Sequence, residues 1–319
     1  MLIPYDLQDK LMRELMPQNG SAGSVQQPLG ELCALVDLAR VDDAVRTGLL
    51  ERFNGRIYPL LKDPGFEKWQ DYGAVLVAPK EHDLEQQSHL FHELADYNSD
   101  VVSAWVASTL TTAELAQHLR GATFAYEEVV RQEIDWDNYG VEQKEEARYL
   151  LRYYDPLITP VLYGDAPEDW QQWFFAPVLS WWFAQPNAKG EQWYQIIGAR
   201  RARAGAAPKL MLTEALKQAL EHDPLPYAIL DFLEKQGTAR FNHDCRGVRL
   251  AQVQQRIAEA RKQGFTSKGH LGEYVWLSFH YAMPQLLGHS RWAAVKREAL
   301  QKQRRLIELV ALYIKTETA

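Results

Sequence analysis

Short apolar runs and longer amphipathic segments alternate along the first two-thirds of the chain. Apolar runs bounded by turn residues are typical of buried strands, and they occur at residues 32–38, 56–61, 72–77, 101–107 and 193–197. Helical periodicity occurs between these runs, at residues 41–53, 84–97 and 111–119. Alternation of strands with helices of this length favours an N-terminal α/β domain with a mixed, partly parallel sheet.

Beyond residue 209 the pattern is helical throughout. Leu212, Leu216 and Leu220 recur every four residues, which places them on one face of a helix. Further helical segments are predicted at residues 227–235, 250–260, 267–283 and 292–315. The sequence therefore predicts an α+β fold, in which the α/β domain is followed by an all-helical C-terminal domain.

Two polar segments divide the chain, whose 319 residues are long for one domain. A short amphipathic helix at residues 4–16 precedes a stretch rich in Gly, Ser and Gln, which is typical of a flexible leader. The segment ARRARAGAAPK carries four positive charges and no acid, so it is a linker or a basic arm for an acidic partner. The predicted parts are a leader (1–28), an α/β domain (29–198), a linker (199–209) and a helical domain (210–319).

The tract Leu150-Leu151-Arg152-Tyr153-Tyr154-Asp155-Pro156 is predicted to be a short buried strand that stops at an Asp-Pro turn. Pro156 has no backbone N–H and disfavours helical geometry at Asp155, so strand pairing ends there. Arg152 and Asp155 are charged groups in a mostly apolar tract, where an unpaired charge is costly. We therefore expect a structural ion pair, with a catalytic Arg–Asp couple as the alternative.

Large aromatic side chains are concentrated immediately after this tract, in residues 170–183. They form either a core or a patch that binds a partner, because exposed aromatics are typical of interfaces. The candidates for partner binding are Trp173, Phe175, Trp181 and Trp182, together with Tyr274 and Trp276 of the helical domain. Residues 127–146 hold eight acidic residues, so this segment is a solvated edge or an acidic patch for a basic partner.

Composition narrows the function classes. The net charge of −7 argues against nucleic-acid binding, and no apolar run has the length of a membrane helix or of a signal-peptide core. Cys33 and Cys245 lie far apart and outside any metal-ligand spacing, which disfavours zinc and a disulfide framework. We expect a cytoplasmic protein that has no cofactor and no metal site.

Few residues suggest chemistry, and each has a structural interpretation. His82, His89 and His92 lie on a predicted helical segment, where His89 and Glu93 have the spacing to share a metal, although a third ligand is missing. The sequence His243-Asp244-Cys245 contains a thiol and a base, but adjacent residues rarely point at one another. Asp37 is at a strand end, where α/β enzymes place catalytic groups, and it is equally suited to cap a helix or pair with an arginine. A hydrolase that uses Asp37, His243 and Cys245 is therefore the alternative to a binding protein.

Four short motifs occur in a recognisable order: Ala34-Leu35-Val36-Asp37-Leu38-Ala39, Val77-Ala78-Pro79, Leu151-Arg152-Tyr153-Tyr154-Asp155-Pro156 and Ala176-Pro177-Val178. This order resembles the type VI secretion system effector adaptors, also called effector chaperones, whose shared N-terminal region was long catalogued as a domain of unknown function. The resemblance covers about residues 30–185. This chain departs from the family pattern at two positions: Leu157 stands where the family often has an arginine, and Lys80 where it often has an aromatic residue.

The resemblance implies a cytoplasmic, non-enzymatic adaptor. Such a protein binds one toxin effector before secretion and delivers it to the spike protein at the tip of the secretion tube. The more variable C-terminal part of these adaptors is the expected cargo-selecting region. A general protein-interaction module outside secretion is a further alternative, which differs only in its partner.

Overall fold

The structure is a computed structural model that describes residues 5–16, 28–94, 97, 101–133, 141–201, 205–221, 223–237, 239, 241–243 and 245–314. The predicted leader after residue 16 lies mostly outside these residues. The chain divides into two compact units. Unit 1 contains Met1–Gln185 and Trp193–Glu221, and unit 2 contains Pro186–Gln192 and His222–Ala319.

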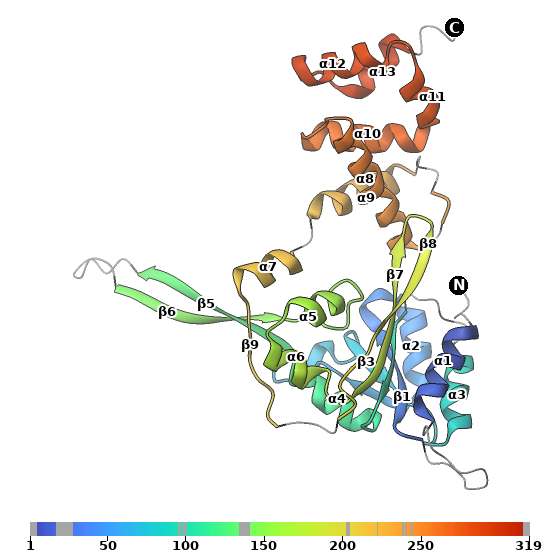
Figure 1. The fold of residues 1–319 in the computed structure, drawn as a ribbon, viewed down its shortest axis with the longest axis vertical. Helices are drawn as coiled ribbons and strands as arrows, with labels where there is room; N and C mark the ends of the chain where they lie inside the picture. Colours follow the sequence, from blue (N-terminus) through green and yellow to red (C-terminus); the bar gives the residue numbers. More distant parts are fainter. Residues whose placement is uncertain are drawn as a thin grey trace. The chain divides into compact units, whose positions relative to one another are not determined.

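Unit 1 is built on a six-stranded sheet with the strand order β2-β3-β1-β4-β7-β8 (Figure 1). Its strands are β1 (Glu31–Asp37), β2 (Ile57–Pro59), β3 (Ala74–Val77), β4 (Val102–Ser108), β7 (Val178–Asn187) and β8 (Gly190–Ile196). The β2–β3, β3–β1, β1–β4 and β4–β7 pairs are antiparallel. The alternation of strands and helices thus indicated the strands of this sheet except β7, but it does not fix the direction in which each strand runs.

A smaller sheet contains the parallel pairing. A long hairpin of β5 (Phe124–Glu133) and β6 (Val141–Leu150) is joined by the short β9 (Leu210–Met211), which runs parallel to β5. The acidic segment 127–146 belongs to this hairpin, and its residues 134–140 lie outside the described ones. With both sheets, the α+β class and the mixed strand directions are confirmed.

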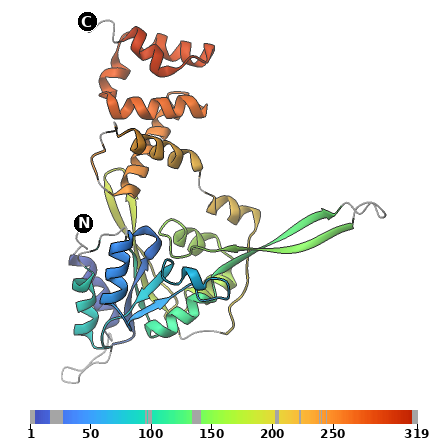
Figure 2. The same ribbon diagram turned by 180° about the vertical axis from the view of Figure 1, so that it is seen from behind.

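Helices cover both faces of the large sheet (Figures 1 and 2). One face carries α1 (Tyr5–Leu15), α2 (Asp43–Arg52) and α3 (Leu84–Glu93), and the other carries α4 (Thr112–Arg120), α5 (Thr159–Asp165) and α6 (Glu168–Phe174). Every residue of β1 is buried, because successive side chains enter opposite cores. Cys33 and Leu35 pack beneath α4, whereas Leu32, Ala34 and Val36 pack on the α1–α3 side.

The predicted strand at residues 150–154 is wrong. β6 ends at Leu150, whose side chain is exposed, and residues 151–158 form turns. The side chains of Leu151, Tyr153 and Tyr154 are buried in the core from this turn. Their burial explains the apolar and aromatic character of the tract without a strand. The predicted strands near residues 57, 74, 102 and 193 are present with shorter or shifted ends, and β7 was not predicted.

The domain boundary lies further along the chain than the predicted linker at 199–209. Unit 1 continues through β9 and α7 (Glu214–Leu220) to Glu221. Leu210 pairs with β5 and is fully buried, and Leu216 is buried in the α4–α6 core. The leucine stripe that seemed to open the helical domain therefore packs on unit 1.

Unit 2 is helical apart from the tip of the β7–β8 hairpin. Its described helices are α8 (Pro224–Gln236), α9 (Arg246–Lys262), α10 (Lys268–His280), α11 (Met283–Gly288), α12 (Trp292–Lys302) and α13 (Leu306–Tyr313). The predicted single helix over 292–315 is wrong, because Gln303 adopts a left-handed conformation (φ 49°) and separates α12 from α13. The break lets Leu306, Leu309 and Val310 enter the core. No helix in the described part of the chain is long and apolar enough to cross a membrane.

The assignment of α7 to unit 1 predicts the effect of Leu216→Ala. The side chain is 1% exposed, so its truncation should lower the free energy of unfolding by about 2–5 kcal/mol in urea titrations followed by tryptophan fluorescence. The matched control is Leu300→Ala, at a 38% exposed leucine, which should change stability by about 0.5 kcal/mol. Equal effects of the two variants would contradict the packing of α7.

Candidate functional site

Two aspartates and two arginines meet at the C-terminal end of β1. Asp37 is the last residue of β1, and its buried carboxylate (2% exposed) accepts from Arg152 at 3.1 Å and lies 3.3 Å from Arg40 Nε in an ion pair. Arg40 also reaches Asp155 at 3.2 Å, and Arg152 lies 3.7 Å from the same oxygen. We call Asp37, Arg40, Arg152 and Asp155 the Asp37 clamp.

Local hydrogen bonds place each carboxylate of the clamp. The Ala39 amide donates to Asp37 Oδ1 at 3.2 Å, which makes Asp37 the N-cap of a short 3₁₀ helix, Leu38–Arg40. The Leu157 amide donates to Asp155 Oδ1 at 3.0 Å, which forms an Asx turn through Pro156. These bonds leave Oδ2 of both aspartates directed at the arginines.

The buried turn after β6 supports the clamp. The Thr159 hydroxyl donates to the Tyr153 carbonyl at 2.7 Å, and Gln185 Nε2 donates to the Pro156 carbonyl at 3.0 Å. Tyr154 is 5% exposed and lies under the Arg152 guanidinium, 5.7 Å from its carbon to the ring centre. The turn therefore holds its polar groups in one conformation.

Electrostatics in the clamp favour the charged state. Burial alone would lower the pKa of the Arg152 guanidinium, but the carboxylates of Asp37 and Asp155 outweigh it and raise this pKa. Burial, followed by the charge of Asp37, raises the pKa of the Tyr154 hydroxyl. Every carboxylate oxygen of the two aspartates is engaged, so the clamp ties the end of β1 to the turn at 151–159. The predicted Arg152–Asp155 contact is present, although the shorter partner of Arg152 is Asp37.

The predicted partner-binding aromatics of unit 1 are core residues. Trp181 and Trp182 follow each other on β7, so they enter opposite cores, with exposures of 0% and 8%. Trp173 and Phe175 are also buried, and the Trp173 ring contacts the buried His118 ring in a tilted arrangement, with centroids 4.4 Å apart. Their assignment to a partner surface is therefore wrong: Trp173, Phe175 and Trp181 pack in the core between β7 and helices α4–α6, and Trp182 packs in the core on the α1–α3 side.

The candidates in unit 2 have local partners. Tyr274 is 1% exposed and belongs to the helical core, so its assignment to a partner surface is also wrong, whereas the half-buried Trp276 stacks on His280 at 3.8 Å. His243 Nδ1 accepts from the Cys245 amide at 3.0 Å and is thus occupied by backbone. Asp37 belongs to unit 1 and its carboxylate is held by the clamp. The predicted hydrolase set is therefore engaged in structural hydrogen bonds.

His89 and Glu93, whose spacing would allow them to share a metal, have different partners in the structure. Arg56 donates to both oxygens of Glu93, at 2.8 and 2.9 Å, and these bonds lower the pKa of the Glu93 carboxyl. His89 instead lies near Glu85, at 4.0 Å. No group of three or more metal-ligating side chains occurs within the described ranges.

A second polar group lies at the opposite end of β1 and was missed by the sequence analysis. Glu31 is buried, with its side chain 5% exposed, and its Oε1 accepts from the Thr112 amide at 3.1 Å and from the Thr112 hydroxyl. Beside it opens a cavity of about 750 Å³. Burial, followed by the charge of Glu31, raises the pKa of the nearby Cys33 thiol. In the sequence, Glu31 precedes an apolar run and Thr111-Thr112 caps a predicted helix. The contact between Glu31 and Thr112 was missed because it is a tertiary contact between distant segments.

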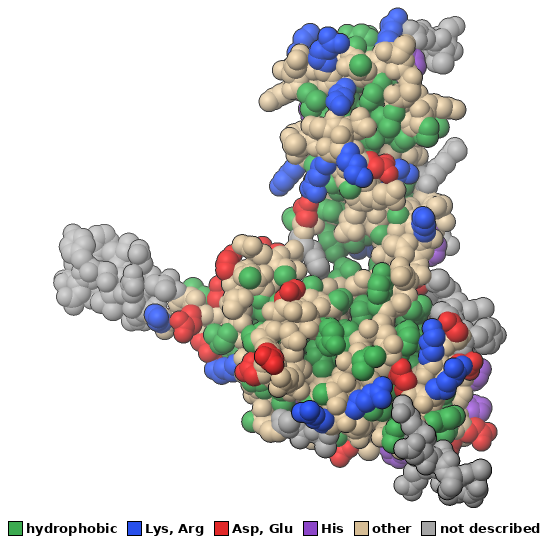
Figure 3. Space-filling view, in the orientation of Figure 1, with side chains coloured by type: hydrophobic (Ala, Val, Ile, Leu, Met, Phe, Trp, Pro, Cys, Tyr) green, Lys and Arg blue, Asp and Glu red, His purple; other side chains and the backbone are tan. Residues whose placement is uncertain are grey.

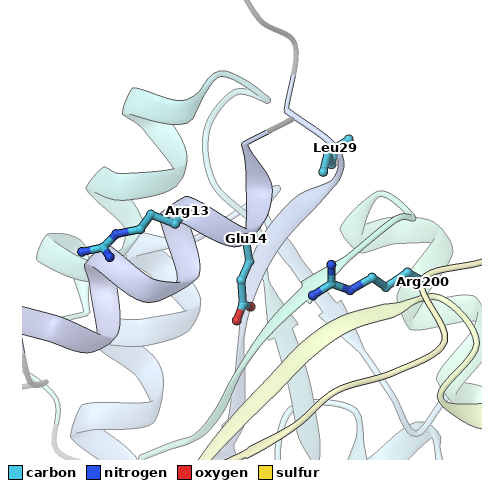
Figure 4. A pocket seen from close by; sticks show the side chains of 4 residues that line it. All are labelled: Arg13, Glu14, Leu29 and Arg200. Atoms are coloured by element: carbon cyan, nitrogen blue, oxygen red, sulfur yellow. The ribbon is translucent and has the colours of Figure 1, made fainter. Parts of the chain in front are cut away.

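A smaller cavity of about 470 Å³ lies nearby and shares Leu29 with the first (Figure 4). Arg13, Glu14 and Arg200 also line it, so its lining carries two positive charges and one negative charge. Glu14 comes from α1 and accepts from Gln195 of β8 at 2.6 Å. The lining residues of the two cavities therefore differ in charge, although Leu29 lines both.

Comparison with known families gives one match. Residues 32–172 match the family model DUF4123, described as a domain of unknown function. The matched region runs from β1 to α6 and contains all four residues of the Asp37 clamp. No curated protein and no solved structure matches the chain.

The Asp37 clamp predicts a loss of stability in Asp37→Asn. The variant keeps the cap to Ala39 but removes the charge that two arginines share. Because Arg40 and Arg152 retain access to water, we expect a loss of roughly 1–3 kcal/mol in urea unfolding rather than the full cost of an isolated buried charge. Asp43→Asn, at a 93% exposed carboxylate paired with Arg46, is the matched control. If both variants were equally stable, the clamp would contribute nothing.

The Arg56–Glu93 pair predicts a pH dependence. The pKa of Glu93 is lowered from its ordinary 4.5, so its contribution to stability is present above about pH 4.5 and disappears as the pH falls through the folded-state pKa. Glu93→Gln should cost about 1 kcal/mol at pH 7 and progressively less in acid. Stability measured across this range, with the 82% exposed Glu85→Gln as control, tests it. A constant deficit at every pH would contradict the assignment.

Proposed function

We propose that this protein is a cytoplasmic adaptor, which binds a toxin effector of type VI secretion and loads it onto the spike protein without catalysis of its own. The proposal combines the motif order with the way these motifs fit together in unit 1. It assigns unit 1 the role of the shared scaffold and unit 2 that of cargo selection. The partners are therefore polypeptides.

The motifs that carry the resemblance form one assembly. Ala34 of the first motif pairs with Val77 of the second in the β1–β3 ladder. Asp37 of the first motif binds Arg152 of the third, 115 residues away. The Pro177 carbonyl of the fourth accepts from the Thr109 amide at the end of β4, at 2.8 Å. Short motifs that meet in space support a shared fold better than their order alone does.

Exposed apolar side chains in unit 1 support binding of a polypeptide. Tyr163 of α5 is 42% exposed, and its hydroxyl donates to the carbonyl of the exposed Ile197 at 3.3 Å. Tyr194 of β8 is 40% exposed and stacks on Phe183. Figure 3 shows apolar side chains on the face that carries α5 and β7. In the described part of the chain, β8 is also an edge strand of the large sheet, and such edges can pair with extended segments of a partner.

The observation that carries the proposal is the Asp37 clamp inside the DUF4123 match. It uses the charged residues of two quoted motifs to connect two parts of the scaffold, and this structural role supports the proposal. An adaptor requires a rigid scaffold and contact surfaces. A scaffold role explains why the motif with Asp37 and the motif with Arg152 occur together.

Co-expression with the proteins encoded by the adjacent genes tests the proposal. The tagged chain should purify with the neighbouring effector and its spike protein as a complex that survives gel filtration. An effector encoded elsewhere in the same genome, with its own adaptor, is the control and should not be captured. Capture of neither neighbour, or equal capture of both effectors, would contradict the proposed function.

A further inference from the structure

We propose that unit 2 binds an acidic segment of the cargo polypeptide through four cations around an exposed leucine, on a surface formed by α9, α10 and α12. The cations are Lys262, Lys268, Lys296 and Arg297, and we call these four residues together with Leu300 the basic patch. The inference deepens the proposed function and rests on it for the identity of the partner. The site itself is argued from its own charge and geometry.

The two units of the chain carry net charges of opposite sign. Unit 2 contains sixteen Lys and Arg residues and ten Asp and Glu residues, so its net charge is +6. Unit 1 contains nineteen of the former and thirty-two of the latter, so its net charge is −13. Figure 3 shows more Lys and Arg than Asp and Glu side chains on the visible face of unit 2. An acidic polypeptide is therefore attracted to unit 2 and repelled by unit 1.

The acidic side chains on the helices of unit 2 already have cationic partners outside the basic patch. Glu298 of α12 pairs with Lys302 and Arg304, at 3.3 and 3.1 Å. The others that pair with an arginine are Asp223, Asp231, Glu234, Glu259, Glu273 and Glu308. Among the described residues, none forms an ion pair or a side-chain hydrogen bond with a cation of the basic patch. Their charges are therefore available to a partner.

The turn between α9 and α10 holds two of the cations in place. Lys262 is the last residue of α9 and Lys268 is the first residue of α10, and both are exposed. Gly264 ends α9 with a left-handed φ of 93°, and the Phe265 amide donates to the Ala260 carbonyl at 3.1 Å. The Phe265 side chain is fully buried. The turn is therefore fixed before a partner arrives.

The exposed face of α12 adjoins this turn. Lys296 and Arg297 precede Leu300 by four and three residues, so the three side chains share one face of the helix. A Cβ on Gly264 would lie 3.9 Å from Leu300 Cδ1, and His270 of α10 donates to a backbone carbonyl just beyond α12 at 3.0 Å. Leu300, which is 38% exposed, therefore lies where the cations of α12 meet those of the turn.

The position of Lys268 is not explained by the stability of its own helix. It directly follows the cap Ser267, and the positive end of the helix dipole disfavours a cation there. The first turn of α10 contains no acidic residue that would offset this charge. A carboxylate from a partner would be favoured by both the lysine and the dipole.

The occupant follows from the charge of the patch and from its apolar centre. Carboxylates complement the four cations, and an apolar side chain between them would cover Leu300. A polypeptide segment in which Asp and Glu flank a leucine supplies both groups. The sugar–phosphate backbone of a nucleic acid supplies the negative charge alone, so the patch fits an acidic polypeptide better.

Fluorescence anisotropy with a synthetic peptide and the full chain tests the site. The probe is fluorescein-labelled Glu-Asp-Leu-Glu-Glu-Leu-Asp-Glu, and its partner probe replaces each acid with the corresponding amide. Lys268→Glu combined with Arg297→Glu should weaken binding of the acidic probe about tenfold, because two attractions become repulsions. Leu300→Ala should weaken it roughly threefold through lost apolar contact. Equal binding of the acidic and the amide probe would overturn the inference.

The matched control reverses two lysines of unit 2 outside the patch. Lys189→Glu with Lys235→Glu changes the net charge by the same amount. Both lie beside the first part of α9, because Gln252 donates to the Ala188 carbonyl and Glu234 pairs with Arg246. This control should change binding by about twofold at most, since salt screens distant charges. Equal losses in the two double variants, or equally tight binding of an oligonucleotide with the same charge, would overturn the inference.

Two further measurements separate the possible failures. Lys268→Glu places an acid at a favourable helix end, and an unchanged melting temperature verifies that the double variant is folded. Equal capture of the neighbouring effector by the wild type and by the Lys268→Glu, Arg297→Glu variant would overturn the basic patch as its docking site and leave the adaptor role standing. If the wild type captures no effector, the proposed function fails, while the peptide titration still decides whether the patch binds an acidic segment.

Discussion

The ion pairs of Asp37 connect the central strand of unit 1 to the turn on which the rest of its core depends. The carboxylate is buried at the end of β1, so it requires charged partners, and Arg40 and Arg152 provide them from two different segments. The turn at 151–159 in turn directs α5 and α6 onto the sheet, with Tyr153 and Tyr154 packed beneath it. A rigid scaffold therefore follows from a small charged group at one strand end.

A buried carboxylate lies at each end of β1 and has charged or polar partners there. At its C-terminal end every carboxylate oxygen of the clamp is engaged, and the group acts as a fastening. At its N-terminal end Glu31 is equally buried, with Oε1 accepting from Thr112 and Oε2 ion-paired with His82 at 2.6 Å. β1 is thus connected through buried carboxylates to the turn at 151–159 at one end and to the N-terminus of α4 at the other.

The sequence predicted the elements of unit 1 better than their arrangement. β1 could be predicted because a strand buried on both faces gives a nearly continuous apolar run in the sequence. The Thr111 cap could be predicted because capping depends only on neighbouring residues. β7 was not predicted because tryptophans point into the cores on both of its faces, so its sequence shows no alternation of apolar and polar residues. The helix break at Gln303 was missed because Lys302, Gln303 and Arg304 have good helical propensity, while the break is fixed by the Leu306 amide donating to Glu273. The pairing of Glu31 with Thr112, 81 residues away, exists only in the folded chain.

The central claim is that this protein holds another polypeptide, and hydrogen–deuterium exchange of the chain with and without the neighbouring effector tests it most directly. The account predicts slower exchange on binding in α5 and β8, where Tyr163 and Tyr194 are exposed, while the amides of the Asp37 clamp remain equally protected in both states. Unchanged exchange throughout unit 1 and unit 2 in the presence of saturating effector would contradict it.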